Sequence, residues 1–234
     1  LFKLWDSLAN VLDEKTPFRW AGLALVGLLI ARGVEKKQDE SKIQGIFQNV
    51  LGLDKTNAKT LSQSIINLSS DNEEDVNKAR KNIQDVLNSP KFEKAMQDFA
   101  NLDEDLRRNK IQDFVNQTEM SVEEIKQLLP KNLETNYPEM QKARDELISA
   151  AISKSIFSDV NMKAKKLGRD GSFEDDKQKL NNYYKDRKSE LETQYSNLNL
   201  SLNQLNIEVD DNQQTVTVSS GGLEKTVGAS TGRQ

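Results

Sequence analysis

One uninterrupted apolar stretch, residues 20–31 (WAGLALVGLLIA), constrains the fold of this chain more than any other feature. It lies in a polar sequence of 234 residues whose mean hydropathy is −0.72 and of which 35% are hydrophobic. A helix formed by this stretch has no polar face, so we expect apolar groups to surround it on every side. The interior of a helical bundle or oligomer and the lipid of a membrane both meet that requirement.

The length of this helix leaves both environments open. We expect it to cover residues 17–34, because Pro17 suits a first helical position. At 1.5 Å per residue, the part from Phe18 to Val34 is about 25 Å long. The hydrocarbon core of a bilayer is about 30 Å thick, so spanning requires Arg19 and Arg32 to extend their side chains outward. The residues predicted to form the membrane or assembly helix are Phe18, Trp20, Leu23, Leu25, Val26, Leu28, Leu29 and Ile30.

A short amphipathic helix is predicted to precede the apolar one. Leu1, Leu4, Leu8 and Val11 recur at helical spacing over residues 1–13 and share one face. The amphipathic helix and the apolar helix together form the first predicted segment of the chain, residues 1–37.

Residues 38–136 are predicted to form an array of short amphipathic helices. Polar residues that favour helix starts recur along this segment, and apolar residues at helical spacing follow each of them. The predicted starts are Ser41, Asp54, Asp71 or Asn72, Ser89, Asp103 and Ser121, with Glu124 completing a capping-box pattern. Each helix has a single narrow apolar stripe, so the helices must pack on one another or on neighbouring subunits.

Residues 137–206 are predicted to form a long helical hairpin. Its helices cover residues 138–167 and 173–206, and a Gly-containing turn joins them. The second helix carries a coiled-coil seam of Tyr184, Leu191, Tyr195, Leu198, Leu202 and Leu205, in which Lys188 completes the alternating spacings of four and three. The seam can pack within the chain or against another subunit, although its tyrosines disfavour a dry dimeric zipper.

The C-terminal segment, residues 207–234, changes from helical to alternating periodicity. Ile207, Val209, Val216 and Val218 alternate with polar residues, which predicts a hairpin or an edge strand open to strand addition by a partner. Residues 219–234 are rich in Gly, Ser and Thr and are expected to be flexible. The predicted fold class is therefore mainly α: an apolar helix, an array of short helices, a long helical hairpin and a β-like tail.

The composition of the chain excludes several classes of functional site. The chain has no cysteine and no histidine, which excludes disulfides and thiolate metal sites and removes the commonest general base. Its net charge is −4 and its basic residues are spread along the chain, so no nucleic-acid footprint is indicated. The acidic clusters at residues 71–75, 103–105 and 174–176 lack the ligand order of a calcium loop and lie at predicted helix starts.

From these observations we expect a non-enzymatic protein. No catalytic residue, metal site, cofactor or small-molecule substrate is predicted, and specific nucleic-acid recognition is not expected. The expected partners are protein subunits, including copies of this chain, together with a membrane if the apolar helix reaches one.

A polar, helical, coiled-coil-bearing chain with the isolated segment WAGLALVGLLIA resembles, in overall plan, the internal or ejection (core) proteins and tape-measure segments of tailed bacteriophages. The resemblance implies a structural virion component whose copies surround a genome-delivery channel and whose residues 17–34 approach the host membrane. Two alternatives share these parts. One is a membrane-anchored accessory subunit of a large complex, with Lys36 and Lys37 marking its cytoplasmic or matrix side. The other is a pore-forming or translocator protein.

Overall fold

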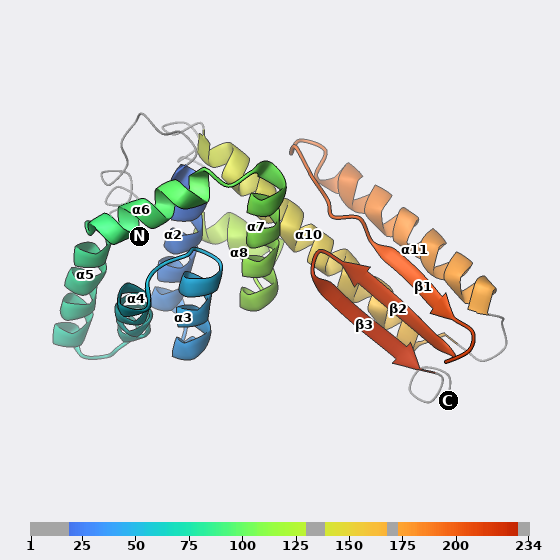
Figure 1. Cartoon of the computed structure of the whole chain (residues 1–234), viewed down its shortest axis with the longest axis horizontal. Coiled ribbons are helices and arrows are strands. Elements are labelled where there is room, and N and C mark those ends of the chain that lie inside the picture. Colours follow the sequence, from blue (N-terminus) through green and yellow to red (C-terminus); the bar gives the residue numbers. More distant parts are fainter. Residues whose placement is uncertain (1–18, 130–138, 168–172, 229–234) are drawn as a thin grey trace. The chain divides into compact units, whose positions relative to one another are not determined.

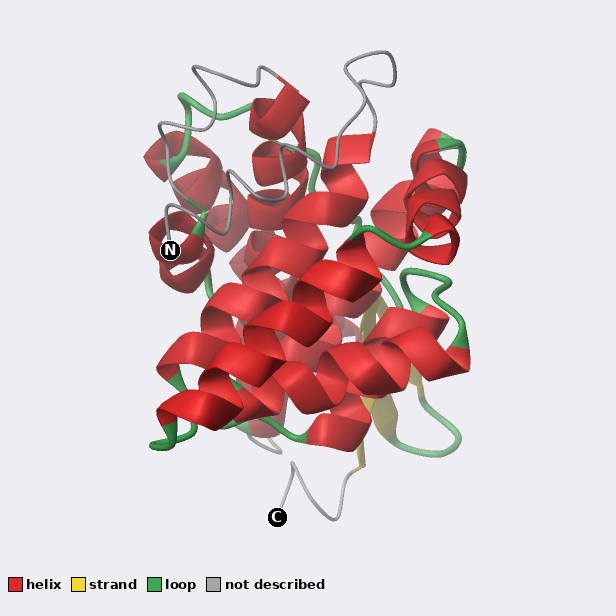
Figure 2. Cartoon of the chain, turned by 90° about the vertical axis from the view of Figure 1, so that its left-hand side faces the viewer, coloured by secondary structure: helices red, strands yellow, loops and turns green. Residues whose placement is uncertain are grey.

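The computed structural model describes residues 19–129, 139–167 and 173–228 (Figure 1). These residues are mainly helical and include a small three-stranded sheet near the C-terminus (Figure 2). The chain divides into two compact units. Unit 1 comprises Leu1–Thr118 and Glu123–Arg144, and unit 2 comprises Glu119–Val122 and Asp145–Gln234. The amphipathic helix predicted for residues 1–13 lies outside the described residues.

Unit 1 is built from short helices joined by tight turns. They are α2 (Arg19–Glu35), α3 (Glu40–Asn49), α4 (Lys55–Asn67), α5 (Glu73–Leu87), α6 (Pro90–Ala100), α7 (Glu104–Thr118) and α8 (Val122–Leu128). The first residues of α10 (Glu139–Lys165) also belong to this unit. The predicted short helices are thus present, although the boundaries predicted at residues 37 and 137 do not coincide with those of the two units.

Most of the predicted helix starts are correct, because polar side chains cap the free N–H groups of the first turn. Asp54, Asn72, Ser89 and Asp103 each accept a hydrogen bond from a backbone N–H two or three residues further along the chain. The start predicted at Ser41 is wrong. Asp39 caps α3 instead, by accepting a hydrogen bond of 3.2 Å from the backbone N–H of Lys42.

Helix α2 contains the apolar stretch, and the apolar side chains of its residues 21–31 are buried. Leu25, Leu28 and Leu29 are each 0% exposed, and α2 packs against α4 and α6. Two glycines allow close approach, since a Cβ at Gly22 would lie 2.8 Å from Met96 Sδ of α6 and one at Gly33 would overlap Ile65 of α4. Among the described residues, no helix combines the length and apolar character needed to cross a bilayer.

Unit 2 contains the rest of α10, helix α11 (Phe173–Gln194) and the sheet. The sheet has the order β1 (Asn206–Asp210), β2 (Thr215–Ser220), β3 (Leu223–Gly228), and both neighbouring pairs are antiparallel. Strand β1 also contacts α11 (Figure 1). The predicted hairpin is present, with Ile207 opposite Val218 and Val209 opposite Val216.

The tail predicted to be flexible contains a further strand, so that prediction is wrong for residues 223–228. Gly221 and Gly222, with φ of 52° and 84°, form the two-residue turn that brings β3 alongside β2. Positive φ at both turn residues matches the twist of the strands and is readily adopted by glycine. Residues 229–234 lie outside the described part of the chain.

The predicted coiled-coil seam is wrong beyond Gln194, where α11 ends. Leu198, Leu202 and Leu205 lie on a non-helical segment that leads into β1. This segment alternates polar residues with Leu198, Leu200 and Leu202, a spacing of two that suits extended chain as well as the assumed heptad. Its many Asn and Ser side chains also compete for the backbone hydrogen bonds of a helix.

Candidate functional site

The described residues of the predicted membrane or assembly helix lie in a core. Leu23, Leu25, Val26, Leu28, Leu29 and Ile30 are all buried. Phe18 and the side chain of Trp20 lie outside the described part of the chain. Burial within the protein, one of the two environments that the sequence left open, is therefore the environment of the described part of this helix.

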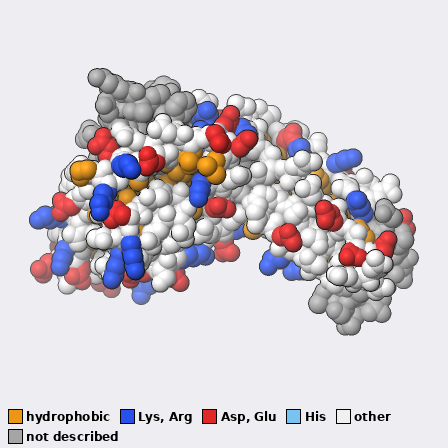
Figure 3. Space-filling view, in the orientation of Figure 1, with side chains coloured by type: hydrophobic (Ala, Val, Ile, Leu, Met, Phe, Trp, Pro, Cys, Tyr) orange, Lys and Arg blue, Asp and Glu red, His pale blue; other side chains and the backbone are white. Residues whose placement is uncertain are grey.

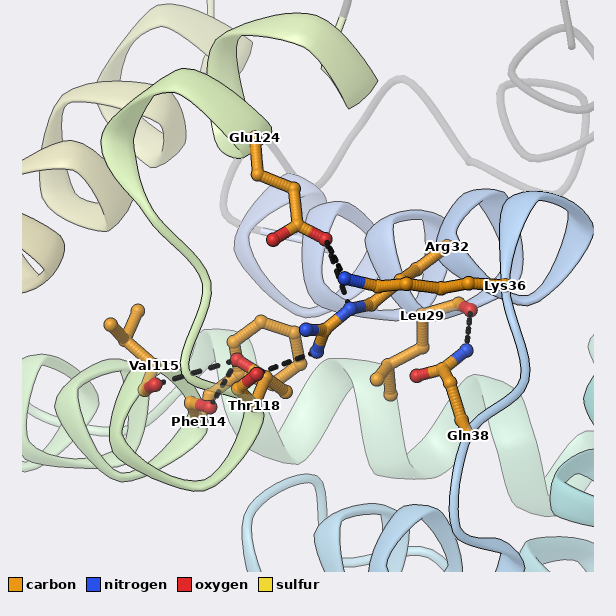
Figure 4. Close-up of polar contacts among 8 residues, drawn as sticks. All are labelled: Leu29, Arg32, Lys36, Gln38, Phe114, Val115, Thr118 and Glu124. Carbon is orange, nitrogen blue, oxygen red and sulfur yellow. Dashed lines mark hydrogen bonds and ion pairs between the residues drawn. The ribbon is translucent and has the colours of Figure 1, made fainter.

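Arg32 does not extend outward from α2 but joins α2 to α7 and α8 (Figure 4). Its Nη1 donates a hydrogen bond of 2.6 Å to the carbonyl oxygen of Thr118, the last residue of α7. Its Nε lies 2.9 Å from Oε1 of Glu124, and Lys36 Nζ lies 3.3 Å from the same oxygen. A cation at the negative end of a helix dipole is favourable, so this cluster stabilises unit 1.

A polar hollow of about 240 Å³ lies between α4 and α5. Each helix contributes residues at positions i, i+3, i+4 and i+7, which share one helical face. The lining residues are Thr60, Gln63, Ser64 and Asn67 from α4 and Asp75, Lys78, Ala79 and Asn82 from α5. The sequence analysis did not identify this site, although amide and hydroxyl residues at helical spacing are visible in the sequence.

Several side chains that line this hollow have unused hydrogen-bonding groups. Gln63, Ser64, Asn67, Lys78 and Asn82 make no side-chain hydrogen bond or ion pair with another described residue. Ser64 is notable because it is only 3% exposed. Unused polar groups at a partly enclosed surface are available to a ligand.

The sheet of unit 2 has one apolar face and one polar face. Ile207, Val216, Val218 and Val227 are buried on the first, whereas the second carries Glu208, Thr217, Glu224 and Thr226. Thr217 and Thr226 are hydrogen-bonded across β2 and β3 at 2.9 Å. Both sides of β2 are already paired, so strand addition at Val216 and Val218 is excluded by β1 and β3.

Among the described residues, no further strand lies beside the outer edge of β3. Its exposed residues are Glu224, Lys225 and Thr226. Lys225 stands opposite Val218, which puts it on the apolar face of the sheet. A lysine at this position of an edge strand discourages unselective pairing with other strands.

The segment between α11 and β1 is bound to α10 by two serines. Ser149 accepts a hydrogen bond of 3.0 Å from the backbone N–H of Ser201, and Ser153 accepts one of 2.9 Å from that of Asn203. The serines are one helical turn apart and the two N–H groups are two extended residues apart, so both spacings are about 6–7 Å.

The predicted seam residues Leu191, Tyr195 and Leu205 are buried, and the Tyr184 hydroxyl accepts a hydrogen bond from Leu205 N–H.

Two charged groups among the described residues, Arg187 and Asp113, have pKa values that are raised by their surroundings. Arg187 donates a hydrogen bond of 2.9 Å to Asp159, which raises the pKa of Arg187. Burial raises the pKa of Asp113, and the charge of Lys110 partly opposes this.

Within the part of the chain that the structure describes, no group of His, Cys, Asp and Glu could hold a metal ion. Basic and acidic side chains are interspersed over the face of unit 1 drawn in Figure 3.

No family model matches the chain, and no curated protein and no solved structure matches it either.

Proposed function

We propose that this protein is a non-enzymatic structural subunit that assembles with copies of itself through the outer edge of β3. The observation that carries the proposal is that β1 contacts α11 and β2 is paired on both sides, whereas the outer edge of β3 has no partner strand among the described residues. Exposed backbone N–H and C=O groups at such an edge can extend a sheet from one subunit to the next.

The charges of β3 disfavour two registers for a pair of antiparallel copies. A two-fold axis at Lys225 would place two lysines directly opposite each other, and an axis at Glu224 would do the same with two glutamates. An axis at Thr226 pairs Thr226 with itself, Glu224 with Gly228 and Lys225 with Val227, and no like charges then face each other. We propose this register, which forms a closed pair with the same patch on both subunits.

The larger setting that we propose is a virion, as the resemblance to tailed-bacteriophage core and tape-measure proteins implies. The support for this setting is the overall plan of the chain. Contact between α2 and a membrane would require α2 to leave α4 and α6, because its apolar residues are buried in unit 1.

Single cysteines test the proposed register directly, because the natural chain has none. Directly opposite residues in an antiparallel pair have Cα atoms about 4.5–5.5 Å apart, within the range of a disulfide. Thr226→Cys is therefore expected to form a covalent dimer under mild oxidation, measured by non-reducing gel electrophoresis. Glu224→Cys is the matched control: it shares the strand and the face, but its two copies would be about 13 Å apart and should not cross-link.

Mass measured by light scattering completes the test. The wild-type chain is expected to show a dimer whose population rises with concentration. A monomer at every concentration, or equal cross-linking of the two cysteine variants, would overturn the proposal.

A further inference from the structure

We infer that the polar hollow between α4 and α5 binds an extended peptide segment about three residues long. The first reason is its size. At about 240 Å³ it is smaller than the roughly 300–1,000 Å³ typical of pockets for drug-sized ligands, so it suits a short segment of a longer partner. This inference concerns unit 1 and does not depend on the sheet edge of unit 2.

The second reason is the chemistry of the lining. Gln63, Asn67 and Asn82 each carry both an amide donor and an amide acceptor, and Ser64 adds a hydroxyl group. A peptide backbone presents the complementary N–H and C=O groups at regular intervals and must satisfy both wherever it is bound. The two charged lining residues, Asp75 and Lys78, have opposite signs, which favours a ligand without net charge.

The third reason is the spacing along α4. Thr60 and Asn67 mark the ends of the lining on this helix, and seven helical residues span about 10 Å. Extended chain advances about 3.3 Å per residue, so this distance corresponds to three residues. A short oligosaccharide has similar polarity, but the lining contains no aromatic side chain on which a sugar ring could stack.

The hydroxyl of Ser64 is a further group that a bound chain can use. A hydroxyl group can both donate and accept a hydrogen bond, so it can meet either an N–H or a C=O of a peptide backbone. Ser64 lines the hollow and its side chain makes no hydrogen bond with another described residue. Acetyl-trialanine amide is the smallest probe that offers a complete set of backbone groups for this site.

The test is a titration of the full-length, isotope-labelled chain with acetyl-trialanine amide, followed by amide NMR. Saturable shifts are expected at the residues that line the hollow. Asn82→Leu should weaken the apparent affinity by about fivefold or more, since it removes neutral hydrogen bonds from the site. Gln84→Leu is the matched control, because Gln84 is an exposed amide on the same helix that does not line the hollow.

Gln63→Leu provides a second variant at an exposed position, where an effect on folding is not expected. It should also weaken binding. Absence of saturable shifts in the wild-type chain, or equal effects of Asn82→Leu and Gln84→Leu, would overturn the inference. Saturable shifts with maltotriose and none with the peptide would overturn it too, by assigning the hollow to a carbohydrate.

Discussion

Two roles are open to Arg32 from the sequence, and its position alone does not distinguish between them. A cation after an apolar run is typical of a membrane flank, but it is equally suited to capping a helix C-terminus. In the structure the guanidinium donates to the last carbonyl of α7 and lies beside Glu124, with 14% of its side chain exposed. Glu124, predicted as part of a capping box, therefore also ties α8 to α2.

Arg32→Ala is expected to lower the free energy of unfolding by about 1–3 kcal/mol, because it leaves a helix-end carbonyl and a half-buried carboxylate without this partner. Lys94→Ala is the control. Its ion pair with Asp98 is long, 3.9 Å, and exposed, so a change within about 0.5 kcal/mol is expected. Urea denaturation followed by circular dichroism measures both, and similar losses in the two variants would contradict the assigned role of Arg32.

At the scale of elements, the burial of α2 depends on how closely it approaches its neighbours. A Cβ at Gly33 would overlap the Ile65 side chain and lie 2.9 Å from the Ile65 carbonyl oxygen. A backbone oxygen cannot move aside as a flexible side chain can, so α2 and α4 would have to separate. The approach of these helices is thus set by the lack of a side chain at Gly33.

Gly33→Ala is expected to destabilise the protein by about 1–3 kcal/mol through overpacking. Gly45→Ala is the matched control and is expected to have the opposite effect on stability, because a Cβ there would meet only Asn49 Nδ2 at 3.9 Å. Alanine in a helix interior is favoured over glycine, so this variant should gain about 0.5–1 kcal/mol. The two shifts in Tm should have opposite signs, and a gain for Gly33→Ala would show that the α2–α4 contact is wrong.

At the scale of the whole molecule, each of the two units has its own buried residues, and α2 lies in the core of unit 1. An ionised carboxylate in such a core costs several kcal/mol, comparable with the total stability of a domain. Leu28→Asp is therefore expected to unfold unit 1. The amide NMR signals of residues 145–228 should remain dispersed, because they belong to the other unit.

Val34→Asp is the control, because it introduces aspartate into the same helix at a position that is 46% exposed. This variant should leave unit 1 folded. Liposome flotation on the wild-type chain adds a second readout. A folded Leu28→Asp variant together with flotation of the wild type would make α2 a membrane-contacting surface and contradict its assignment as a core helix.

Local features of this protein could be predicted from the sequence because they depend on neighbouring residues. Asp54, Asn72, Ser89 and Asp103 cap helices through hydrogen bonds to residues close in the chain, and the Ile207–Val218 hairpin follows from alternation of apolar residues. The turn at Gly221–Gly222 was missed, because residues 219–234 were expected to be flexible, although paired glycines are themselves a hairpin signal.

Tertiary structure alone decided the features that depend on distant partners. The run of leucines at 198–205 fits both a helical and an extended periodicity, and Ser149 and Ser153, some fifty residues earlier, satisfy backbone groups of the extended form. The hollow between α4 and α5 exists only because two helical faces meet. The sequence determined that residues 20–31 must be enclosed by apolar groups, and only the packing of α4 and α6 decided that those groups are the protein's own, because burial depends on which surfaces meet in space.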